Sequence, residues 1–212
     1  MRIVVTRPPA QASELVRRLE ELGHEVAVCP LIRIEALGDE PVDVDGYSWV
    51  VVTSANGARE LLRRRRGRLP AVAAIGPGTA EALRAEGIEP ALVPRVSTQE
   101  GLLAEFPPPG GRVLFAAADG ARRLLPEALD ADVLTLYRTV ELRPPRFPEA
   151  DLVVLASASA ARAYAALDVD APAVSIGPET TGAARSAAVR IVGEAPTHDV
   201  DGLVAAVRAI AG

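Results

Sequence analysis

The sequence predicts an α/β protein made of two parallel-sheet domains. Short apolar strands alternate with helices along all 212 residues, which is typical of parallel sheets. The chain also repeats itself: 49–58 (WVVVTSANGA) returns as 152–163 (LVVLASASAARA), and 74–83 (AIGPGTAEAL) returns as 175–184 (SIGPETTGAA). Because both pairs recur in the same order at a spacing of roughly 100 residues, we infer a duplicated unit.

Apolar runs predict the strands, and apolar residues three or four positions apart predict the helices, as in 11–22, which Gly23 ends. Strands are expected at 2–7, 25–30, 49–52, 71–76, 90–94, 112–118, 132–137, 151–157, 173–177 and 190–195. Helices are expected at 11–22, from the corner at 54 through 62, at 77–86, 99–105 and 121–129, from 158 through 167, from 179, and at 201–209. The segments 32–37 and 138–142 alternate apolar and polar residues, as exposed extended segments do.

The strand count predicts a discontinuous domain. A single cut at the proline-rich stretch 143–148 would give one domain of seven strands and one of three. If the chain instead passes from one domain to the other twice, each domain has five strands. The equal split agrees with the repeat. We therefore expect one α/β domain from 1–34 plus 146–212, an inserted α/β domain at 42–137, and tether strands at 35–41 and 138–145.

A second internal sequence similarity indicates that the order of the strands is permuted between the two halves. Residues 112–142 resemble 2–37, although 112–142 close the inserted domain and 2–37 open the chain. The expected fold is therefore two flavodoxin-like domains, duplicated and circularly permuted in strand order, on a two-stranded β tether.

Composition excludes several kinds of function. The net charge of −5 argues against general nucleic-acid binding, and no apolar run is long enough for a membrane span. All 23 basic residues are Arg, so lysine Schiff-base chemistry and a standard P-loop are excluded. The single Cys29 rules out an internal disulfide and a cysteine-based zinc cluster. We expect a cytoplasmic protein that needs no cofactor or metal.

Most of the predicted strands end in a short turn of small or polar residues that leads into a helix, and each such turn is called a corner below. At the carboxyl ends of parallel strands, free backbone amides and the helix dipole favour an anion by roughly 0.3–2 kcal/mol per site. Several such corners could together hold a ligand with many carboxylates. The candidate binding residues are Arg7, Thr53, Ser54, Asn56, Gly76, Thr79, Ser157, Ser159, Gly177 and Thr180.

Each candidate also has a purely structural interpretation. Five of them could be ordinary helix N-caps: Ser54, Asn56, Thr79, Ser157 and Thr180. The run Arg63–Arg66 is expected to be a solvated charged face, His24 and His198 to be surface residues, and Trp49 and Cys29 to be packing residues.

Two residues break the internal symmetry. When 2–37 is aligned with 112–142, Arg7 matches Ala117 and Tyr137 matches Pro30, so neither residue has a counterpart of the same type in the other half. Duplication alone predicts neither, so a functional role and a packing role are both open for each.

Taken together, these motifs resemble those of the uroporphyrinogen-III synthase family. The resemblance rests on VTRP (5–8), TSANGA (53–58), IGPGTAEAL (75–83), LYRT (136–139), ASASA (156–160), IGPETT (176–181) and DGLVAAV (201–207). Singly each motif is weak, but they occur in the family's order over nearly the whole chain. The family fold is two α/β domains on a flexible β tether.

The resemblance implies a reaction. The family cyclises hydroxymethylbilane to uroporphyrinogen III, inverting the last pyrrole ring and losing water, in tetrapyrrole and haem biosynthesis. It implies no cofactor or metal, a linear tetrapyrrole as substrate, hand-over from the preceding pathway enzyme, and a monomer. Loss of the hydroxyl needs a proton donor, for which Tyr137 is the candidate. The alternative is a two-domain anion-binding protein or sensor without catalysis.

Overall fold

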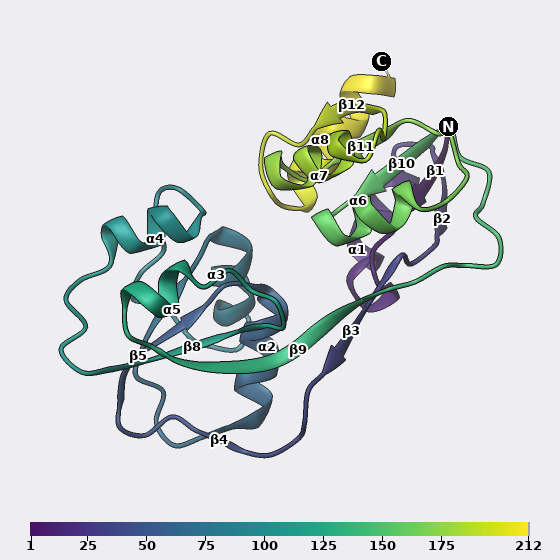
Figure 1. Cartoon of the computed structure of the whole chain (residues 1–212). Helices are drawn as coiled ribbons and strands as arrows, with labels where there is room; N and C mark the ends of the chain where they lie inside the picture. Colours follow the sequence, from purple (N-terminus) through teal and green to yellow (C-terminus); the bar gives the residue numbers. More distant parts are fainter. Residues whose placement is uncertain (212) are drawn as a thin grey trace. The chain divides into compact units, whose positions relative to one another are not determined.

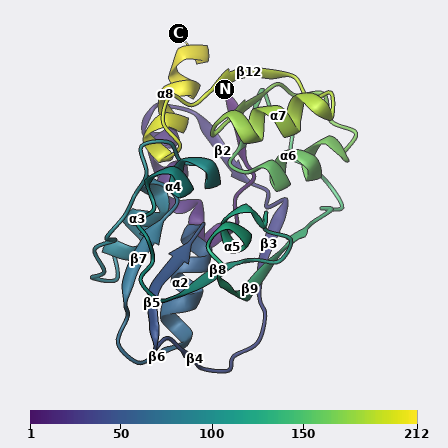
Figure 2. The same ribbon diagram turned by 60° about the vertical axis from the view of Figure 1, so that its left-hand side comes forward.

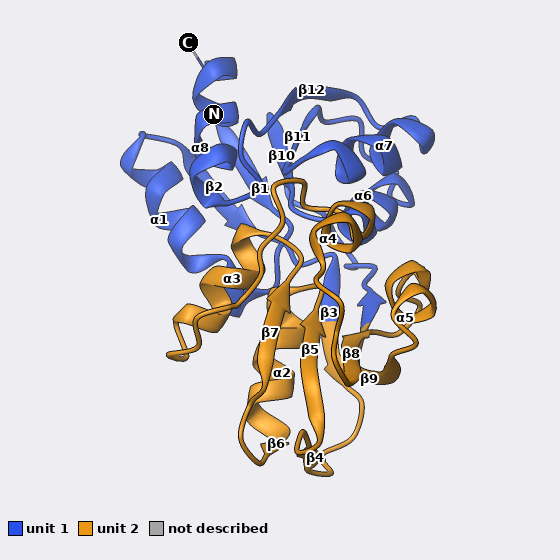
Figure 3. Cartoon of the chain, turned by 90° about the vertical axis from the view of Figure 1, so that its left-hand side faces the viewer, with its two compact units in different colours: residues 1–33, 139–212 blue, residues 34–138 orange. Residues whose placement is uncertain are grey.

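A computed structural model describes residues 1–211 of the chain. These residues form two compact units: unit 1 comprises Met1–Arg33 and the segment from Thr139 onward, and unit 2 comprises Ile34–Arg138 (Figure 3). Each unit is built on a five-stranded sheet. The chain is therefore an α/β protein with two such sheets, as the alternation of strands and helices predicted.

The sheet of unit 1 has the strand order β12-β11-β10-β1-β2, and all its neighbours are parallel. Its strands are β1 (Arg2–Val5), β2 (Glu25–Val28), β10 (Leu152–Leu155), β11 (Ala173–Ser175) and β12 (Ile191–Glu194). Helices α1 (Ser13–Glu21) and α8 (Val200–Ala211) pack on one face, and α6 (Ala158–Ala165) and α7 (Pro178–Ser186) on the other, where they lie side by side (Figure 2). A short 3-10 helix, η1 (Pro9–Gln11), precedes α1.

The sheet of unit 2 has the order β3-β9-β8-β5-β7, of which Figure 1 labels β3, β9, β8 and β5. Its strands are β3 (Ile32–Ala36), β5 (Tyr47–Val52), β7 (Ala71–Ala74), β8 (Arg112–Ala118) and β9 (Asp132–Glu141). Helices α2 (Ala55–Arg64) and α3 (Pro77–Arg84) cover one face, and α4 (Gln99–Glu105) and α5 (Leu124–Ala128) the other. A small parallel pair, β4 (Val42–Asp43) with β6 (Arg65–Arg66), lies outside this sheet.

The two sheets show the same neighbour relations in a different chain order. In unit 1, β10 lies between β1 and β11, with β2 beyond β1 and β12 beyond β11. In unit 2, β5 lies between β8 and β7, with β9 beyond β8 and an isolated bridge at Leu92 beyond β7. The strands that open the chain in unit 1 thus match those that close unit 2.

Several expected elements differ in extent. The strand expected at 90–94 is only a single bridge between Ala73 and Leu92, because two prolines limit the backbone donors there. The fifth strand of the unit 2 sheet is β3 instead, in a segment expected to be exposed. Strand β9 runs on from the predicted 132–137 to Glu141. The helix expected from 121 begins only at Leu124, and the β4–β6 pair was not expected.

Candidate functional site

The carboxyl end of β5 carries the first predicted corner of unit 2. Ser54 is the N-terminal cap of α2: its backbone is extended, and its Oγ accepts a hydrogen bond from the amide of Gly57 over 2.9 Å. Thr53 precedes the cap and Asn56 lies in the first turn of α2, and both are partly buried. The first amides of a helix have no acceptor within the helix, so this corner favours an anion.

Tyr137 reaches the same corner from β9. Its phenol Oη lies 2.8 Å from Ser54 Oγ, and only 6% of the residue is exposed. The pairing of β8 with β9 is irregular at this point, where Ala118 opposes Tyr137, and such an irregularity can re-aim a side chain. A Cβ on Gly57 would lie 3.7 Å from the tyrosine ring and 3.1 Å from Ser54 Oγ, so a glycine leaves room for the pair.

The Ser54–Tyr137 pair can supply one proton. Two hydroxyls carry two protons, and their mutual hydrogen bond uses one of them. Ser54 Oγ already accepts from Gly57, so the remaining proton can go to a third acceptor. Burial raises the pKa of Tyr137 above its ordinary value of 10, although the hydrogen bond to Ser54 acts in the opposite direction. The phenol therefore stays protonated at neutral pH.

The second corner of unit 2 follows β7. Gly76 caps α3 with an extended backbone, and a Cβ there would lie 2.6 Å from Ser97 Oγ. The glycine thus permits close packing of the loop before α4. Thr79 lies inside α3 and is 6% exposed, so its interpretation as an N-cap is wrong.

In unit 1, Ser157 repeats the role of Ser54. It caps α6, and its Oγ accepts from the amide of Ala160 over 3.1 Å. Ser159 lies in the first turn of α6, where its Oγ accepts from Arg162 over 3.1 Å. Arg162 also lies 3.5 Å from Glu141, so Ser159 belongs to a local polar cluster.

The corner after β11 repeats that after β7. Gly177 caps α7, and a Cβ there would lie 2.7 Å from the ring of His198, which is exposed as expected. Thr180 lies inside α7 and is 3% exposed, so it too is not an N-cap.

The internal repeat also includes the turns that precede α4 and α8. Thr98 caps α4 by accepting from the amide of Gly101 over 3.0 Å, and Asp199 accepts from the amide of Gly202 over 2.7 Å at the start of α8. Ser97 and His198, which contact the two glycine caps, directly precede these capping residues. The segments STQEGL (97–102) and HDVDGL (198–203) share this pattern, which was the overlooked signal.

The candidate cation of unit 1 follows β1. Arg7 is partly buried, and the preceding Thr6 donates its hydroxyl proton to the carbonyl of Val154 over 2.8 Å. Unit 2 also has cations after the matching strand β8, since Arg122 and Arg123 lie in the connection to α5.

A buried chain of hydroxyls in unit 1 was also missed. Ser175 Oγ lies 2.6 Å from Thr181 Oγ1, and Thr181 donates in turn to the carboxylate of Glu194. The duplicated positions in unit 2 are Ala74 and Ala80, so this chain is specific to unit 1. Ser175 is fully buried, which makes the chain a link between β11, α7 and β12.

Three other structural interpretations can be compared with the structure. Trp49 packs against Phe106 at 4.9 Å between ring centroids, and Cys29 is buried, which raises the pKa of its thiol. Both are packing residues as expected. The run Arg63–Arg66 is not a uniformly solvated face, because Arg64 is 8% exposed and its guanidinium donates to backbone carbonyls.

The cap geometry predicts modest effects from two single substitutions. Ser54→Ala and Ser157→Ala should each lower kcat/KM by no more than the equivalent of about 1–2 kcal/mol, because each removes a cap but leaves the first-turn amides. Steady-state kinetics on folded variants tests this. Loss of all turnover in either variant would instead identify that hydroxyl as a reacting group.

Within residues 1–211, no group of three or more His, Cys, Asp or Glu is placed to hold a metal ion. None of the helices formed by these residues has the length and apolar character required to cross a membrane.

Comparison with known proteins agrees with the motifs. The family model described as "Uroporphyrinogen-III synthase HemD" matches residues 13–205. A putative uroporphyrinogen-III synthase of Archaeoglobus fulgidus is 34% identical over 68% of this chain and 62% of its own length. One from Methanocaldococcus jannaschii is 28% identical over 66% and 63%. The matches thus span less than two thirds of these two relatives. The uroporphyrinogen-III synthase of Synechococcus elongatus is 26% identical over 97% of this chain and 93% of its own.

Solved structures share the fold. The crystal structure of uroporphyrinogen-III synthetase from Helicobacter pylori aligns with a TM-score of 0.66 and 16% identity, over 99% of this chain and 100% of that chain. A mutant uroporphyrinogen III synthase from Thermus thermophilus aligns with a TM-score of 0.63 and 17% identity, over 99% and 98%. With the family match covering most of its length, the chain belongs to the uroporphyrinogen-III synthase family.

Proposed function

We propose that this protein cyclises hydroxymethylbilane to uroporphyrinogen III. Family membership supports the reaction, and the observation that carries it in the structure is the Ser54–Tyr137 pair, which holds a transferable proton at a strand end. The carbon–oxygen bond of the terminal hydroxymethyl group breaks as a proton reaches the leaving oxygen, and water departs. Inverting the last pyrrole ring breaks its bond to the existing bridge carbon and forms two carbon–carbon bonds, one from each neighbouring bridge carbon to an α-carbon of that ring. The proton lost from the ring's free α-carbon balances the proton that departs in the water. We assign Tyr137 as the proton donor and Ser54 as the residue that orients it.

The substrate's acetates and propionates suit the corners of each unit. In unit 2 we propose that carboxylates bind near Thr53, Ser54, Asn56, Gly76 and Thr79, and in unit 1 near Arg7, Ser157, Ser159, Gly177 and Thr180. Because Thr79 and Thr180 are buried, binding there would use backbone amides and not the hydroxyls. Recognition by amides allows a protein with a net charge of −5 to hold a polyanion. Holding the chain of pyrroles in one conformation is then the main task of the enzyme.

We further propose that the units are two flavodoxin-like domains, one a circular permutation of the other, at 1–34 plus 146–212 and at 42–137. The matching neighbour relations of the two sheets support this. The segments 35–41 and 138–145 would be the tether. Backbone hydrogen bonds from Leu37 to Leu136 (2.8 Å) and from Leu142 to Leu31 (2.9 Å) support their pairing. We also propose a cytoplasmic monomer that receives its substrate from the preceding enzyme; the single Cys29 fits a reducing compartment.

The activity is tested by the isomers formed. Freshly made hydroxymethylbilane is incubated with the protein, and the products are oxidised and separated. We expect mainly the type III isomer, with the same yield after treatment with a chelator, because no cofactor or metal is proposed. Type I alone, the spontaneous product, would favour the alternative of an anion-binding protein without catalysis. Activity lost on chelation would contradict the metal-free mechanism.

Domain closure gives a separate prediction. A tether of two strands should let the two domains move relative to each other when the ligand binds. Small-angle scattering should therefore show a smaller radius of gyration when product is added under anaerobic conditions. An unchanged radius at saturating product would indicate a preformed rigid site.

A further inference from the structure

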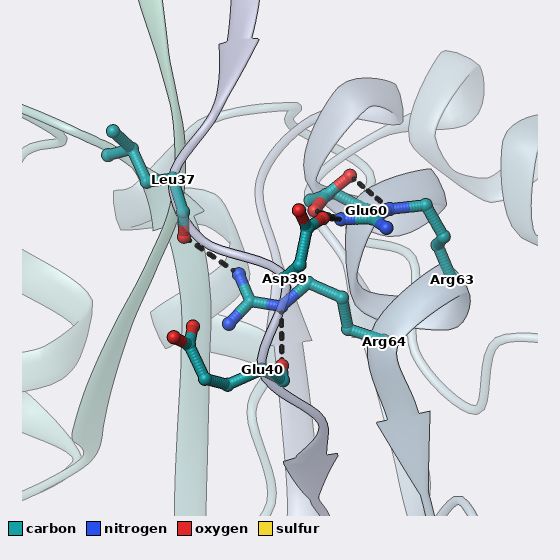
Figure 4. A network of polar contacts seen from close by, with 6 residues as sticks. All are labelled: Leu37, Asp39, Glu40, Glu60, Arg63 and Arg64. Atoms are coloured by element: carbon teal, nitrogen blue, oxygen red, sulfur yellow. Dashed lines mark hydrogen bonds and ion pairs between the residues drawn. The ribbon is translucent and has the colours of Figure 1, made fainter.

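Arg64 is a buried cation held by backbone carbonyls. It is the last residue of α2 and is 8% exposed. Its Nε donates to the carbonyl of Glu40 over 2.8 Å, and its Nη1 donates to the carbonyl of Leu37 over 3.0 Å (Figure 4). The guanidinium thus binds both ends of the segment 37–40, which connects β3 to the rest of unit 2.

The neighbouring Arg63 does not share this role. It is exposed, and its guanidinium pairs with the carboxylates of Asp39 and Glu60, each at 2.7 Å (Figure 4). The pair with Asp39 is exposed on both sides and contributes little to stability, whereas a buried cation needs its hydrogen-bond partners. The residue that matches Arg64 in the first repeat of unit 1 is Leu167, so duplication does not account for the arginine.

The backbone of the clamped segment leads directly to the candidate site. The amide of Leu37 donates to the carbonyl of Leu136 over 2.8 Å, and Tyr137 is the next residue of β9. Tyr137 is hydrogen-bonded to Ser54, and Ser54 is the N-terminal cap of α2, the helix that ends at Arg64. Helix α2 is therefore joined to β9 at both ends, directly through Ser54 at its start and through Arg64 and Leu37 at its end.

We propose that Arg64 is a positioning residue for the Ser54–Tyr137 pair. By holding Leu37 against β9, it fixes the last turn of α2 relative to the strand that carries the phenol, and so keeps the phenol within hydrogen-bond distance of its partner. Gly38 makes the tight segment possible: its φ is +83°, and a Cβ there would lie 2.5 Å from Glu40 Oε2. This inference rests on the proposed function, because it acts through Tyr137.

The test compares three variants with the wild-type protein. Arg64→Met keeps a long apolar chain but donates no hydrogen bond, and kcat for type III formation should fall about tenfold with KM little changed. Arg64→Lys restores a donor and should recover part of this loss. Arg63→Met, the matched control one position away, should retain wild-type kcat because Arg63 bonds the carboxylates of Asp39 and Glu60 and does not hold the backbone of the segment 37–40.

A double substitution separates positioning from a general structural effect. If Arg64 acts through the phenol, Arg64→Met should lower kcat much less in a Tyr137→Phe background, where no phenol proton remains to be positioned. Equal losses in both backgrounds would overturn the inference, as would equal losses in the Arg63 and Arg64 variants. If Arg64→Met fails to fold, the same cycle is run with Arg64→Lys. Absence of type III product from the wild-type protein would instead refute the proposed function.

Discussion

Replacing Tyr137 with phenylalanine should lower turnover by about 10²–10⁴-fold, the usual contribution of general acid catalysis. The substitution keeps the ring, which packs in the core of unit 2 at 6% exposure, and removes only the hydroxyl. Loss of one hydrogen bond to Ser54 costs about 0.5–1.5 kcal/mol, so the melting temperature should change by only a few degrees. Single-turnover assays with hydroxymethylbilane and thermal unfolding measure the two effects independently.

Ser54→Ala is the matched comparison, because it breaks the same hydrogen bond from the other side and leaves the phenol proton in place. A fall in turnover of less than about tenfold in Tyr137→Phe would mean that a carboxylate of the substrate supplies the proton. Tyr137 would then be a packing residue, and the synthase assignment would stand. If Tyr137 is the acid, its raised pKa adds a condition on pH: turnover should not decline through loss of this proton until the pH exceeds 10.

The fold could be predicted because its signals are local and periodic. Helix α4 has the bounds expected for it, since residues 99–105 have helical spacing. The strand expected at 90–94 is too long, because apolar residues between prolines resemble a strand, while the backbone bonds to β7 there involve only the two residues Ala91 and Leu92. The role of β3 could not be deduced from alternation, which does not reveal which strand lies next to it.

The corners of the candidate site were predictable, but their internal contacts were not. A serine after a strand and before a helix is a cap signal, and both Ser54 and Ser157 are caps. The contact between Ser54 and Tyr137 joins residues 83 positions apart, and nothing in either local sequence specifies it. Arg64 was placed with the solvated arginines for a related reason. Its burial depends on the carbonyls of a segment that lies 24–27 positions earlier in the chain.

Gly202→Ala should produce the largest loss of stability among single-methyl additions in unit 1. A Cβ at this position would lie 2.0 Å from the carbonyl oxygen of Thr197, and because that oxygen belongs to the backbone, the turn itself must move. The turn includes Asp199, whose carboxylate accepts from the amide of Gly202. Helix α8 begins there and buries Leu203 and Val207 against the sheet. Overpacking a close contact and disturbing a cap together should cost about 3 kcal/mol.

Urea unfolding of this variant and two others tests the prediction. Gly101→Ala should be similarly destabilising in unit 2, because its Cβ would lie 2.1 Å from the carbonyl oxygen of Val96. Gly182→Ala is the control: it lies inside α7, no atom is within 4 Å of the added Cβ, and alanine should stabilise the helix by about 0.5–1 kcal/mol. Equal free energies of unfolding for the three variants would show that the turns at Gly101 and Gly202 move to accommodate the added methyl group at little cost. Destabilisation of Gly101→Ala and Gly202→Ala alone would establish that these turns are rigid supports, holding Ser97 and His198 against the glycine caps of α3 and α7.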